Sequence, residues 1–380
     1  MVRKADKNMQ KIKDIIKHSA FFGRFYLLLV GMIIAILKIF VQTDDKTVLF
    51  ISFSGRKFND SPKAIYDAMR ADAAFADYNL VWAFNDPDQF PDVDAAHKIS
   101  ANGLGYFKQL LHAKYWVANS SIERLVPFKH PHNIYIQTWH GVPLKKLGPD
   151  EANLEFLVKH WFAKAQFDVL LASSEYDADI FSRIFPSSAK PTITGLPRSA
   201  NLLRDRSAEI ANLQDKLQLD IQKKTVLYAP TFREYDSEFA SALSQAAQEG
   251  LASEYNLLVR GHYFMNDNVV IGIDVTEFAD LNLLMQASDI LITDYSSIMF
   301  DYAVLNRPIV LLQPDAEEYA AKRGMYLDPA ELGLPIVTDE MSLFEALGKV
   351  NHQELAAFAH RFEQHDATYG ISTVLNEIRK

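Results

Sequence analysis

From Thr47 onward, short apolar runs alternate with stretches in which apolar residues recur at helical spacing. The apolar runs predict buried strands, and the amphipathic stretches between them predict helices. The expected strands are residues 48–53, 78–84, 115–118, 133–138, 167–172 and 191–194, then 225–229, 256–260, 269–273, 290–293 and 308–312. The expected helices are residues 62–70, with Ser61 as N-cap and Pro62 as first residue, and 104–112, 176–185, 199–219, 281–287 and 297–305. This alternation indicates an α/β fold built on parallel sheets.

The charged helix expected at residues 199–219 separates two such sets of strands and helices. A chain of 380 residues is long for one domain, at about 150 residues per domain. We therefore expect a membrane-associating segment at 1–43, a Rossmann-like domain at 44–205 and a second at 206–380, whose terminal helix can pack back on the first. The two domains are expected to face one another across a cleft, with ligands at the carboxyl ends of the strands.

The N-terminal segment is basic and then apolar. The first 17 residues hold six lysines and arginines against two aspartates, and a charge-free run of 13 residues from Phe25 to Leu37 follows. That run is shorter than the roughly 20 residues that span a bilayer, and no small-x-small cleavage site of a signal peptide follows it. The preferred interpretation is a helix lying in the membrane surface, its basic residues against anionic headgroups. A transmembrane span and a buried helix are the alternatives.

Composition excludes several classes of protein. The chain has no cysteine, which rules out a disulfide-rich secreted scaffold and thiolate metal sites. Its net charge of −9 argues against nucleic acid as the main ligand. Neither half contains Gly-x-Gly-x-x-Gly after a first strand or a Walker A motif, which weakens dehydrogenase and nucleotide-triphosphatase interpretations.

Polar residues placed just after strands carry the candidate chemistry instead. His140 follows the strand expected at 133–138 and precedes a tight turn through Gly141 and Pro143. An imidazole titrates near physiological pH and suits proton abstraction from a hydroxyl, so His140 is the candidate catalytic base. The alternative is a structural histidine that bonds its own loop.

A second pair of candidates, Arg260 and His262, follows the strand at 256–260. If the backbone stays extended, the two side chains share one face, where they could hold a pyrophosphate and neutralise a departing phosphate. A surface arginine beside an incidental histidine is the alternative.

A third candidate lies at the end of the strand at 290–293, where Asp294 is followed by Ser296 and Ser297 at the expected helix start. Free backbone N–H groups, the helix dipole and two hydroxyls together can bind an anion. Plain N-capping by serine is the alternative.

Two turns supply weaker candidates. Thr231 and Arg233 follow the strand at 225–229 and could touch a nucleotide or phosphate, although a plain turn explains them equally well. Arg198 ends a Gly-Leu-Pro-Arg turn and could point into the cleft. No acidic metal cluster is evident; no cofactor is certain, and a divalent cation remains an open option.

Taken in order, these segments resemble the CDP-glycerol:poly(glycerophosphate) glycerophosphotransferases, the primases and polymerases of wall teichoic acid. The resemblance spans about residues 47–330. The matching segments are Ser54–Lys63, Ala113–Asn119, Gln137–Lys145, Thr194–Arg198, Leu227–Arg233, Val259–His262, Leu291–Tyr302 and Arg323–Tyr326.

The resemblance implies a GT-B architecture, with an N-terminal acceptor domain, a C-terminal domain that binds the CDP-alcohol, and peripheral attachment to the cytoplasmic face of the cell membrane. It implies that His140 acts on the acceptor hydroxyl and that Arg260, His262, Ser296 and Ser297 surround the donor pyrophosphate. The chain departs from the family at Phe232, where tryptophan is frequent, and at Ala200, where an acidic residue is common. Its length is closer to that of the primases.

The expected function is transfer of glycerol phosphate from CDP-glycerol to a hydroxyl of a lipid-linked polymer acceptor, with release of CMP. A CDP-ribitol ribitolphosphotransferase is the nearest alternative, and a GT-B nucleotide-sugar glycosyltransferase is more distant. The non-enzymatic alternative is a membrane-associated binding protein on a decayed transferase fold.

Overall fold

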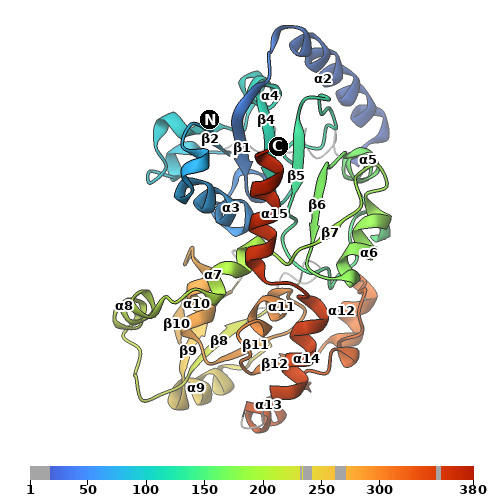
Figure 1. Cartoon of the computed structure of the whole chain (residues 1–380). Coiled ribbons are helices and arrows are strands. Elements are labelled where there is room, and N and C mark those ends of the chain that lie inside the picture. Colours follow the sequence, from blue (N-terminus) through green and yellow to red (C-terminus); the bar gives the residue numbers. More distant parts are fainter. Residues whose placement is uncertain (1–17, 232, 234–241, 262–270, 348–351) are drawn as a thin grey trace, which may run out of the picture. The chain divides into compact units, whose positions relative to one another are not determined.

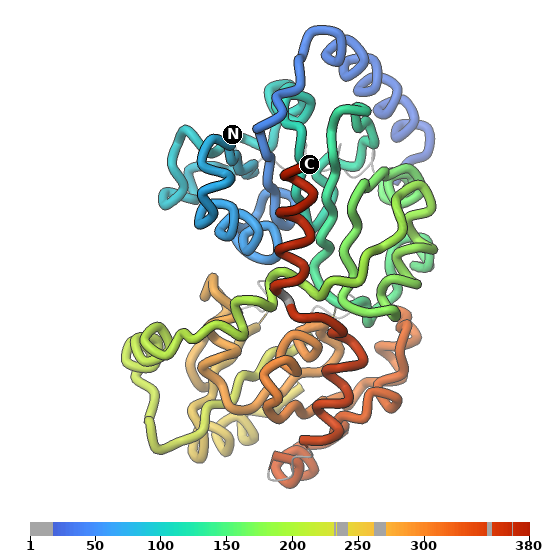
Figure 2. The backbone as a smooth tube through the Cα atoms, viewed as in Figure 1, coloured from blue at the N-terminus to red at the C-terminus, as the bar shows by residue number. Residues whose placement is uncertain are grey.

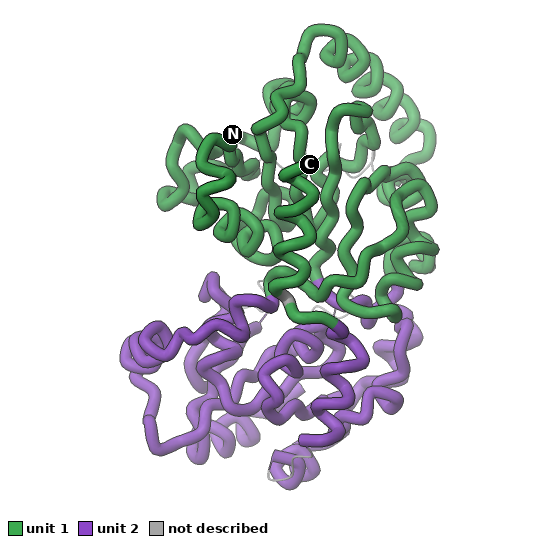
Figure 3. Tube along the Cα trace, in the orientation of Figure 1, with its two compact units in different colours: residues 1–140, 147–198, 365–380 green, residues 141–146, 199–364 purple. Residues whose placement is uncertain are grey.

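The computed structural model describes residues 18–231, 233, 242–261, 271–347 and 352–380 (Figure 1). The chain divides into two compact units (Figure 3). Unit 1 takes its residues from the ranges 1–140, 147–198 and 365–380, and unit 2 from 141–146 and 199–364. Each unit has its own sheet, with seven strands in unit 1 and six in unit 2. The strand pairs are parallel, so the predicted α/β class is confirmed.

The sheet of unit 1 has the strand order β3-β2-β1-β4-β5-β6-β7. Its strands are β1 (Asp44–Ile51), β2 (Asn79–Phe84), β3 (Lys98–Ser100), β4 (Ala113–Ala118), β5 (Ile134–Gln137), β6 (Val169–Ala172) and β7 (Thr192–Ile193). Its helices are α2 (Ala20–Phe40), α3 (Asp60–Ala71), α4 (Gly103–His112), α5 (Phe156–Lys164), α6 (Glu175–Ile184) and α15 (Ala367–Ile378).

The core of unit 1 is apolar and aromatic, and it includes the end of the chain. Phe50 and Trp82, on neighbouring strands, are fully buried and stack with ring centroids 5.5 Å apart. Val374 and Ile378 of α15 belong to the same buried cluster. Figure 2 shows this red C-terminal segment within the blue and green part of the chain that forms unit 1. The C-terminal helix is therefore an integral part of the first sheet's core.

The sheet of unit 2 has the strand order β10-β9-β8-β11-β12-β13. Its strands are β8 (Thr225–Ala229), β9 (Asn256–Val259), β10 (Ile273–Asp274), β11 (Ile290–Thr293), β12 (Ile309–Leu312) and β13 (Ile336–Val337). Its helices are α7 (Ala200–Leu203), α8 (Ser207–Leu217), α9 (Gln245–Glu254), α10 (Leu281–Ala287), α11 (Ile298–Ala303), α12 (Ala316–Arg323), α13 (Glu340–Leu347) and α14 (His352–Phe362).

Both strand orders reverse direction at one place, between β1 and β4 in unit 1 and between β8 and β11 in unit 2. Connections on the two sides of such a switch point leave in opposite directions, so the carboxyl ends of the two strands border a crevice that parallel α/β sheets use for ligands. A ligand site is therefore expected near the carboxyl ends of β1 and β4 in unit 1 and of β8 and β11 in unit 2.

Three sequence-based expectations about these elements need correction. Helix α3 begins at Asp60 with Asn59 as N-cap, not at Pro62 with Ser61. The expected helix at 199–219 is two helices, because Gln286 of α10 donates to the carbonyls of Leu202 and Arg204 and so ends α7. The strand expected at 269–273 is described only as Ile273–Asp274, and residues 269–270 lie outside the described residues.

Helix α2 is longer than its charge-free run suggested. It covers 21 residues from Ala20 to Phe40 and is, within the described residues, the one helix long and apolar enough to cross a membrane by length and composition. Of its residues only Gly23 and Ile34 are buried, and Phe21, Ile39 and Phe40 are about three-quarters exposed, at 75%, 76% and 77%. The buried-helix alternative is therefore wrong.

Candidate active site

His140 lies at the carboxyl edge of the unit 1 sheet, three residues after the end of β5. Its Nδ1 is 2.6 Å from the main-chain oxygen of Asn119, the first residue after β4. A carbonyl oxygen only accepts hydrogen bonds, so Nδ1 carries the proton and Nε2 keeps its lone pair. The half-buried imidazole is therefore held in the tautomer that a general base requires.

The surroundings of His140 also favour its neutral form. Burial lowers its pKa from the ordinary value by penalising the charged imidazolium. The Asn119 carbonyl and Asp60 oppose this shift, while the guanidinium groups of Arg198 and Arg56 add to it. The ring itself is fixed by stacking on Trp139, with centroids 4.5 Å apart, and by the edge of Phe53 at 5.7 Å.

Arg198 reaches the same place from the loop after β7. Its Nη1 donates to the main-chain oxygen of His140 at 2.7 Å and to Oδ2 of Asp60 at 2.9 Å. The side chains of Arg198 and Asp60 are only 13% and 7% exposed, so this ion pair is largely shielded from water. The structure thus brings two predicted site residues together, with Arg198 anchoring the backbone that carries His140.

Backbone strain concentrates around this histidine. Phe53, Ser54, Asp60 and Trp139 have φ angles of 46°, 55°, 66° and 54°, in the left-handed region that non-glycine residues rarely adopt. Each such residue costs on the order of 1–3 kcal/mol and persists where surrounding structure enforces it, which is commonly at functional sites. Here the enforcing bonds include Asn119 Oδ1, which accepts from the N–H of Phe53 at 2.8 Å.

A second polar cluster lies at the carboxyl ends of β8, β11 and β12 in unit 2, centred on Arg233. The Arg233 side chain is fully buried and donates from Nη1 to Asp294 Oδ2 (2.9 Å) and from Nε and Nη2 to the two oxygens of Asp315 (2.7 and 3.0 Å). Burial alone would lower the pKa of this guanidinium, but the hydrogen bonds to Asp315 and Asp294 outweigh it and raise the pKa. Arg233 is therefore a permanent cation neutralised by two carboxylates.

Asp294 ties the two strands of the unit 2 switch point together. Its Oδ1 accepts from the N–H of Thr231 (2.8 Å) and of Tyr295 (2.6 Å), while its main-chain oxygen accepts from Gln313 Nε2 (2.9 Å). The structure thus brings Thr231, Arg233 and Asp294 together; whether they touch a donor stays a prediction. Thr231, just after β8, is thereby tied to Asp294, just after β11.

Two aromatic rings cover the guanidinium. Tyr295 and Tyr319 stack with centroids 3.9 Å apart, and Cζ of Arg233 lies 4.9 Å from each centroid. Lys145 Nζ lies 5.3 Å from the Tyr319 ring. The phenol of Tyr295 donates to Asp315 Oδ1 at 3.1 Å, so this ring also contacts a carboxylate that pairs with Arg233.

The remaining predicted residues lie at neighbouring strand ends of unit 2. Arg260 follows β9, and its Nη1 donates to the carbonyls of Val275 and Phe278 at 3.0 and 2.9 Å. Ser296 and Ser297 are half-buried just before α11, and Ser296 Oγ accepts from the N–H of Ile298 at 3.4 Å. His262 lies outside the described residues.

No group of three or more His, Asp or Glu side chains is placed to hold a metal ion within the part of the chain that the structure describes. Three residues of the two clusters, Asp60, Asn119 and Asp315, were not singled out from the sequence. Asn119 directly follows an apolar strand, the same signal that identified His140. Asp315 lies three residues after the strand expected at 308–312 and carries that signal too. Asp60 carries no such signal, because it does not follow a strand directly and its partner Arg198 is distant in sequence.

Comparisons with known proteins identify the family of the chain. The model of the CDP-Glycerol:Poly(glycerophosphate) glycerophosphotransferase family matches residues 33–379. The teichoic acid poly(glycerol phosphate) polymerase of Bacillus subtilis (strain 168) is 33% identical over 80% of this chain and 44% of its own length. The polymerase of the same name from Bacillus spizizenii is 31% identical over 90% of this chain and 92% of its own length. This chain thus spans less than half of the first relative but nearly all of the second.

The solved structure of the wall teichoic acid polymerase TagF is similar over 100% of this chain and 98% of that chain, with 28% identity and a TM-score of 0.80. A variant of that polymerase has been solved after a soak with CDPG. This likeness, together with the two parallel sheets, confirms the predicted GT-B-like fold.

Proposed function

Because the chain belongs to the CDP-glycerol:poly(glycerophosphate) glycerophosphotransferase family, we propose that it transfers glycerol phosphate from CDP-glycerol to a hydroxyl of a membrane-linked teichoic-acid or related polymer. The match over residues 33–379 carries this proposal, since it includes both polar clusters. Relatives of nearly the same length include a teichoic acid glycerol-phosphate transferase of Staphylococcus aureus, 30% identical over 90% of both proteins. A nucleotide-sugar donor and a purely binding role have no comparable support.

The proposed reaction is an in-line phosphoryl transfer. The acceptor hydroxyl oxygen forms a bond to the glycerol-bearing β-phosphorus, and the bond from that phosphorus to the bridging oxygen breaks. CMP leaves with the bond's electrons, and Nε2 of His140 takes the hydroxyl proton. Positioning and charge stabilisation dominate such reactions. We therefore expect unit 1 to contribute a rigidly held imidazole that carries its proton on Nδ1 and has a free lone pair on Nε2.

Unit 2 is proposed to bind the CDP-alcohol at the carboxyl ends of β8, β9 and β11. Arg260, His262, Ser296, Ser297 and Thr231 are the proposed groups near the donor phosphates. Arg233 and Asp294 are proposed to act by holding Thr231 beside the carboxyl end of β11, since their polar atoms already bond to one another and to Asp315 and Thr231.

The reaction is tested by incubating the full chain with CDP-glycerol and short lipid-linked acceptors and weighing the products by mass spectrometry. We expect acceptors that gain glycerol phosphate units, with one CMP released per unit. Parallel incubations with CDP-ribitol and with nucleotide sugars serve as controls. Extension only with one of those donors would contradict the proposal, and the number of units added separates a primase from a polymerase.

We further propose that α2 attaches the protein in the plane of the membrane, on the cytoplasmic face. Contacts with the rest of unit 1 occur at both ends of the helix: His18 Nε2 lies 3.3 Å from Glu155 Oε1, and Lys38 Nζ donates to the carbonyl of Lys129 at 3.4 Å. Contacts at both ends of the helix support attachment in the membrane plane, since a helix held along unit 1 is not free to cross the bilayer. Its exposed apolar side chains can instead enter the headgroup boundary, where anionic lipids of the cytoplasmic leaflet attract the basic residues.

Membrane attachment of this kind predicts that alkaline carbonate releases the protein from membranes. It also predicts that Phe25→Glu lowers binding to lipid vesicles by roughly tenfold or more, because burial of one aromatic side chain is lost. Leu104→Glu on α4 is the control, since Leu104 is similarly exposed (58% against 62% for Phe25) but lies outside α2. Retention after carbonate, or equal losses in the two variants, would overturn in-plane attachment through α2.

A further inference from the structure

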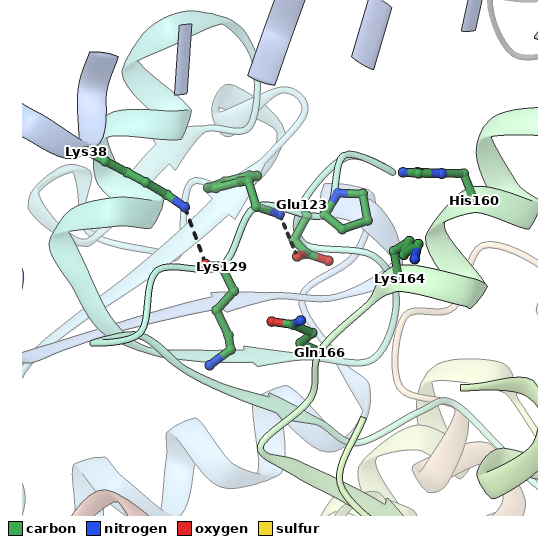
Figure 4. A pocket seen from close by; sticks show the side chains of 8 residues that line it. Lys38, Glu123, Lys129, His160, Lys164 and Gln166 are labelled. Atoms are coloured by element: carbon green, nitrogen blue, oxygen red, sulfur yellow. Dashed lines mark hydrogen bonds between the residues drawn. The ribbon is translucent and has the colours of Figure 1, made fainter. Parts of the chain in front are cut away.

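A basic pocket lies in unit 1 beside the carboxyl end of α2. Its cavity volume is about 390 Å³, and its lining includes Lys38, Glu123, Lys129, His160, Lys164 and Gln166 (Figure 4). That volume is within the range of roughly 300–1,000 Å³ typical of small-molecule sites. The candidate active site uses none of these residues, so the pocket needs its own explanation.

The basic residues of this pocket come from three different elements, and its charge comes from the lysines among them. Lys38 belongs to α2, His160 and Lys164 belong to α5, and Lys129 lies in the segment before β5. Lys129 Nζ is paired with Asp168 Oδ1 at 3.0 Å, so its charge is compensated. Lys38 is half-buried and bonds through Nζ to a main-chain carbonyl, which leaves its charge unneutralised by that contact.

The one acid in the lining does little to cancel these cations. Glu123 is fully buried, with Oε2 accepting from Trp161 Nε1 (3.0 Å) and Oε1 from the N–H of Phe128 (3.4 Å). Burial raises the pKa of its carboxyl to about 7. A share of Glu123 is thus protonated at neutral pH, so the charges of Lys38 and Lys164 are only partly offset within the lining.

The pocket takes one of its lining residues, Lys38, from α2, the helix proposed above to attach the protein to the membrane. The next two residues of that helix, Ile39 and Phe40, are apolar and 76% and 77% exposed. An anionic group held by Lys38 would therefore lie close to the membrane surface. A basic pocket at such a helix suits the phosphate headgroup of a lipid.

We propose that this pocket binds the phosphate headgroup of a membrane lipid, either an anionic phospholipid or the diphosphate of a lipid-linked acceptor. The inference rests on the membrane attachment proposed above and is independent of which unit the enzyme transfers. Lys38 and Lys164 supply the charge, and His160 and Gln166 supply further hydrogen-bonding groups.

The test is vesicle binding by the full chain, without any turnover measurement, so that its outcome does not depend on the transfer reaction. Vesicles are neutral phosphatidylcholine alone, or with phosphatidylglycerol, or with a polyprenyl diphosphate. The variant is Lys38→Gln/Lys164→Gln. The control is Lys159→Gln/Lys190→Gln, which removes the same charge from exposed lysines outside the pocket lining.

We expect all proteins to bind neutral vesicles alike. On at least one kind of anionic vesicle, the pocket variant should bind roughly tenfold or more weakly than wild type, because each lysine near an anionic surface contributes about 1 kcal/mol to binding. The control variant should bind within a fewfold of wild type. The more affected vesicle identifies the headgroup, and Lys38→Arg/Lys164→Arg should restore binding. Equal losses in variant and control would show general surface electrostatics and overturn the site. Loss on neutral vesicles would also overturn it, since it would mean that α2 no longer docks.

Discussion

Replacing His140 with alanine is expected to lower turnover by a factor on the order of 10² to 10⁴ while leaving the affinity for CDP-glycerol nearly unchanged. The reason is the tautomer: Nδ1–H donates to the Asn119 carbonyl at 2.6 Å and keeps its proton, which leaves Nε2 to accept the proton of the acceptor hydroxyl. Without the imidazole, water must take that proton. Single-turnover assays and donor titrations measure the two quantities separately.

The control for this variant is His112→Ala. His112 makes a similar bond, from Nδ1 to the carbonyl of Gln42 at 2.9 Å, but it lies at the end of α4, away from the carboxyl edge of the sheet. Its loss should leave turnover within about twofold, since surface substitutions away from such sites have small effects. Near-wild-type turnover in the His140 variant would remove His140 from the chemistry.

The pH dependence of kcat/KM also tests His140 as the general base. Protonation of Nε2 abolishes the base, so kcat/KM should fall as the pH drops through the pKa of His140. Because burial lowers that pKa, the midpoint of the fall in kcat/KM is expected below the ordinary histidine pKa of about 6.5. The residual rate of the alanine variant should not show this fall.

Replacing Arg233 with methionine is expected to destabilise unit 2 by roughly 3–5 kcal/mol, because it leaves the buried Asp294 and the partly buried Asp315 without their cation. Such a loss is a large fraction of the roughly 5–15 kcal/mol that stabilises a typical domain. Urea-induced unfolding, followed by circular dichroism, measures the free energy of unfolding.

Arg204→Met provides the matched control. Arg204 also pairs with a carboxylate, Glu209, at 2.9 Å, but its side chain is 59% exposed. Solvent screens such a pair, and the change should stay within about 1 kcal/mol. If the Arg233 variant cost no more than this control, the guanidinium would not be the structural centre of the cluster and a direct contact with the donor would become the better account.

The alternation of apolar strands with amphipathic helices was sufficient to predict the two α/β sets, because burial on both faces of a parallel sheet dictates uninterrupted apolar runs such as 225–229 and 290–293. Strand-end position alone was sufficient to single out His140, and the shared strand ends of Thr231, Arg233 and Asp294 brought those three together. These are local properties, readable from neighbours along the chain.

Tertiary structure alone decided what each polar residue does there. The tautomer of His140 depends on a carbonyl 21 residues away. The loop of His140 is anchored by Arg198 and Asp60, which are 138 residues apart in the sequence. The charge of Arg233 is balanced in part by Asp315, which is 82 residues away. The chain's end, through α15, likewise completes a core begun by β1. Hydrogen bonds and ion pairs of this kind join groups that the folded sheet order brings together, and no local pattern of hydrophobic and polar residues encodes that order.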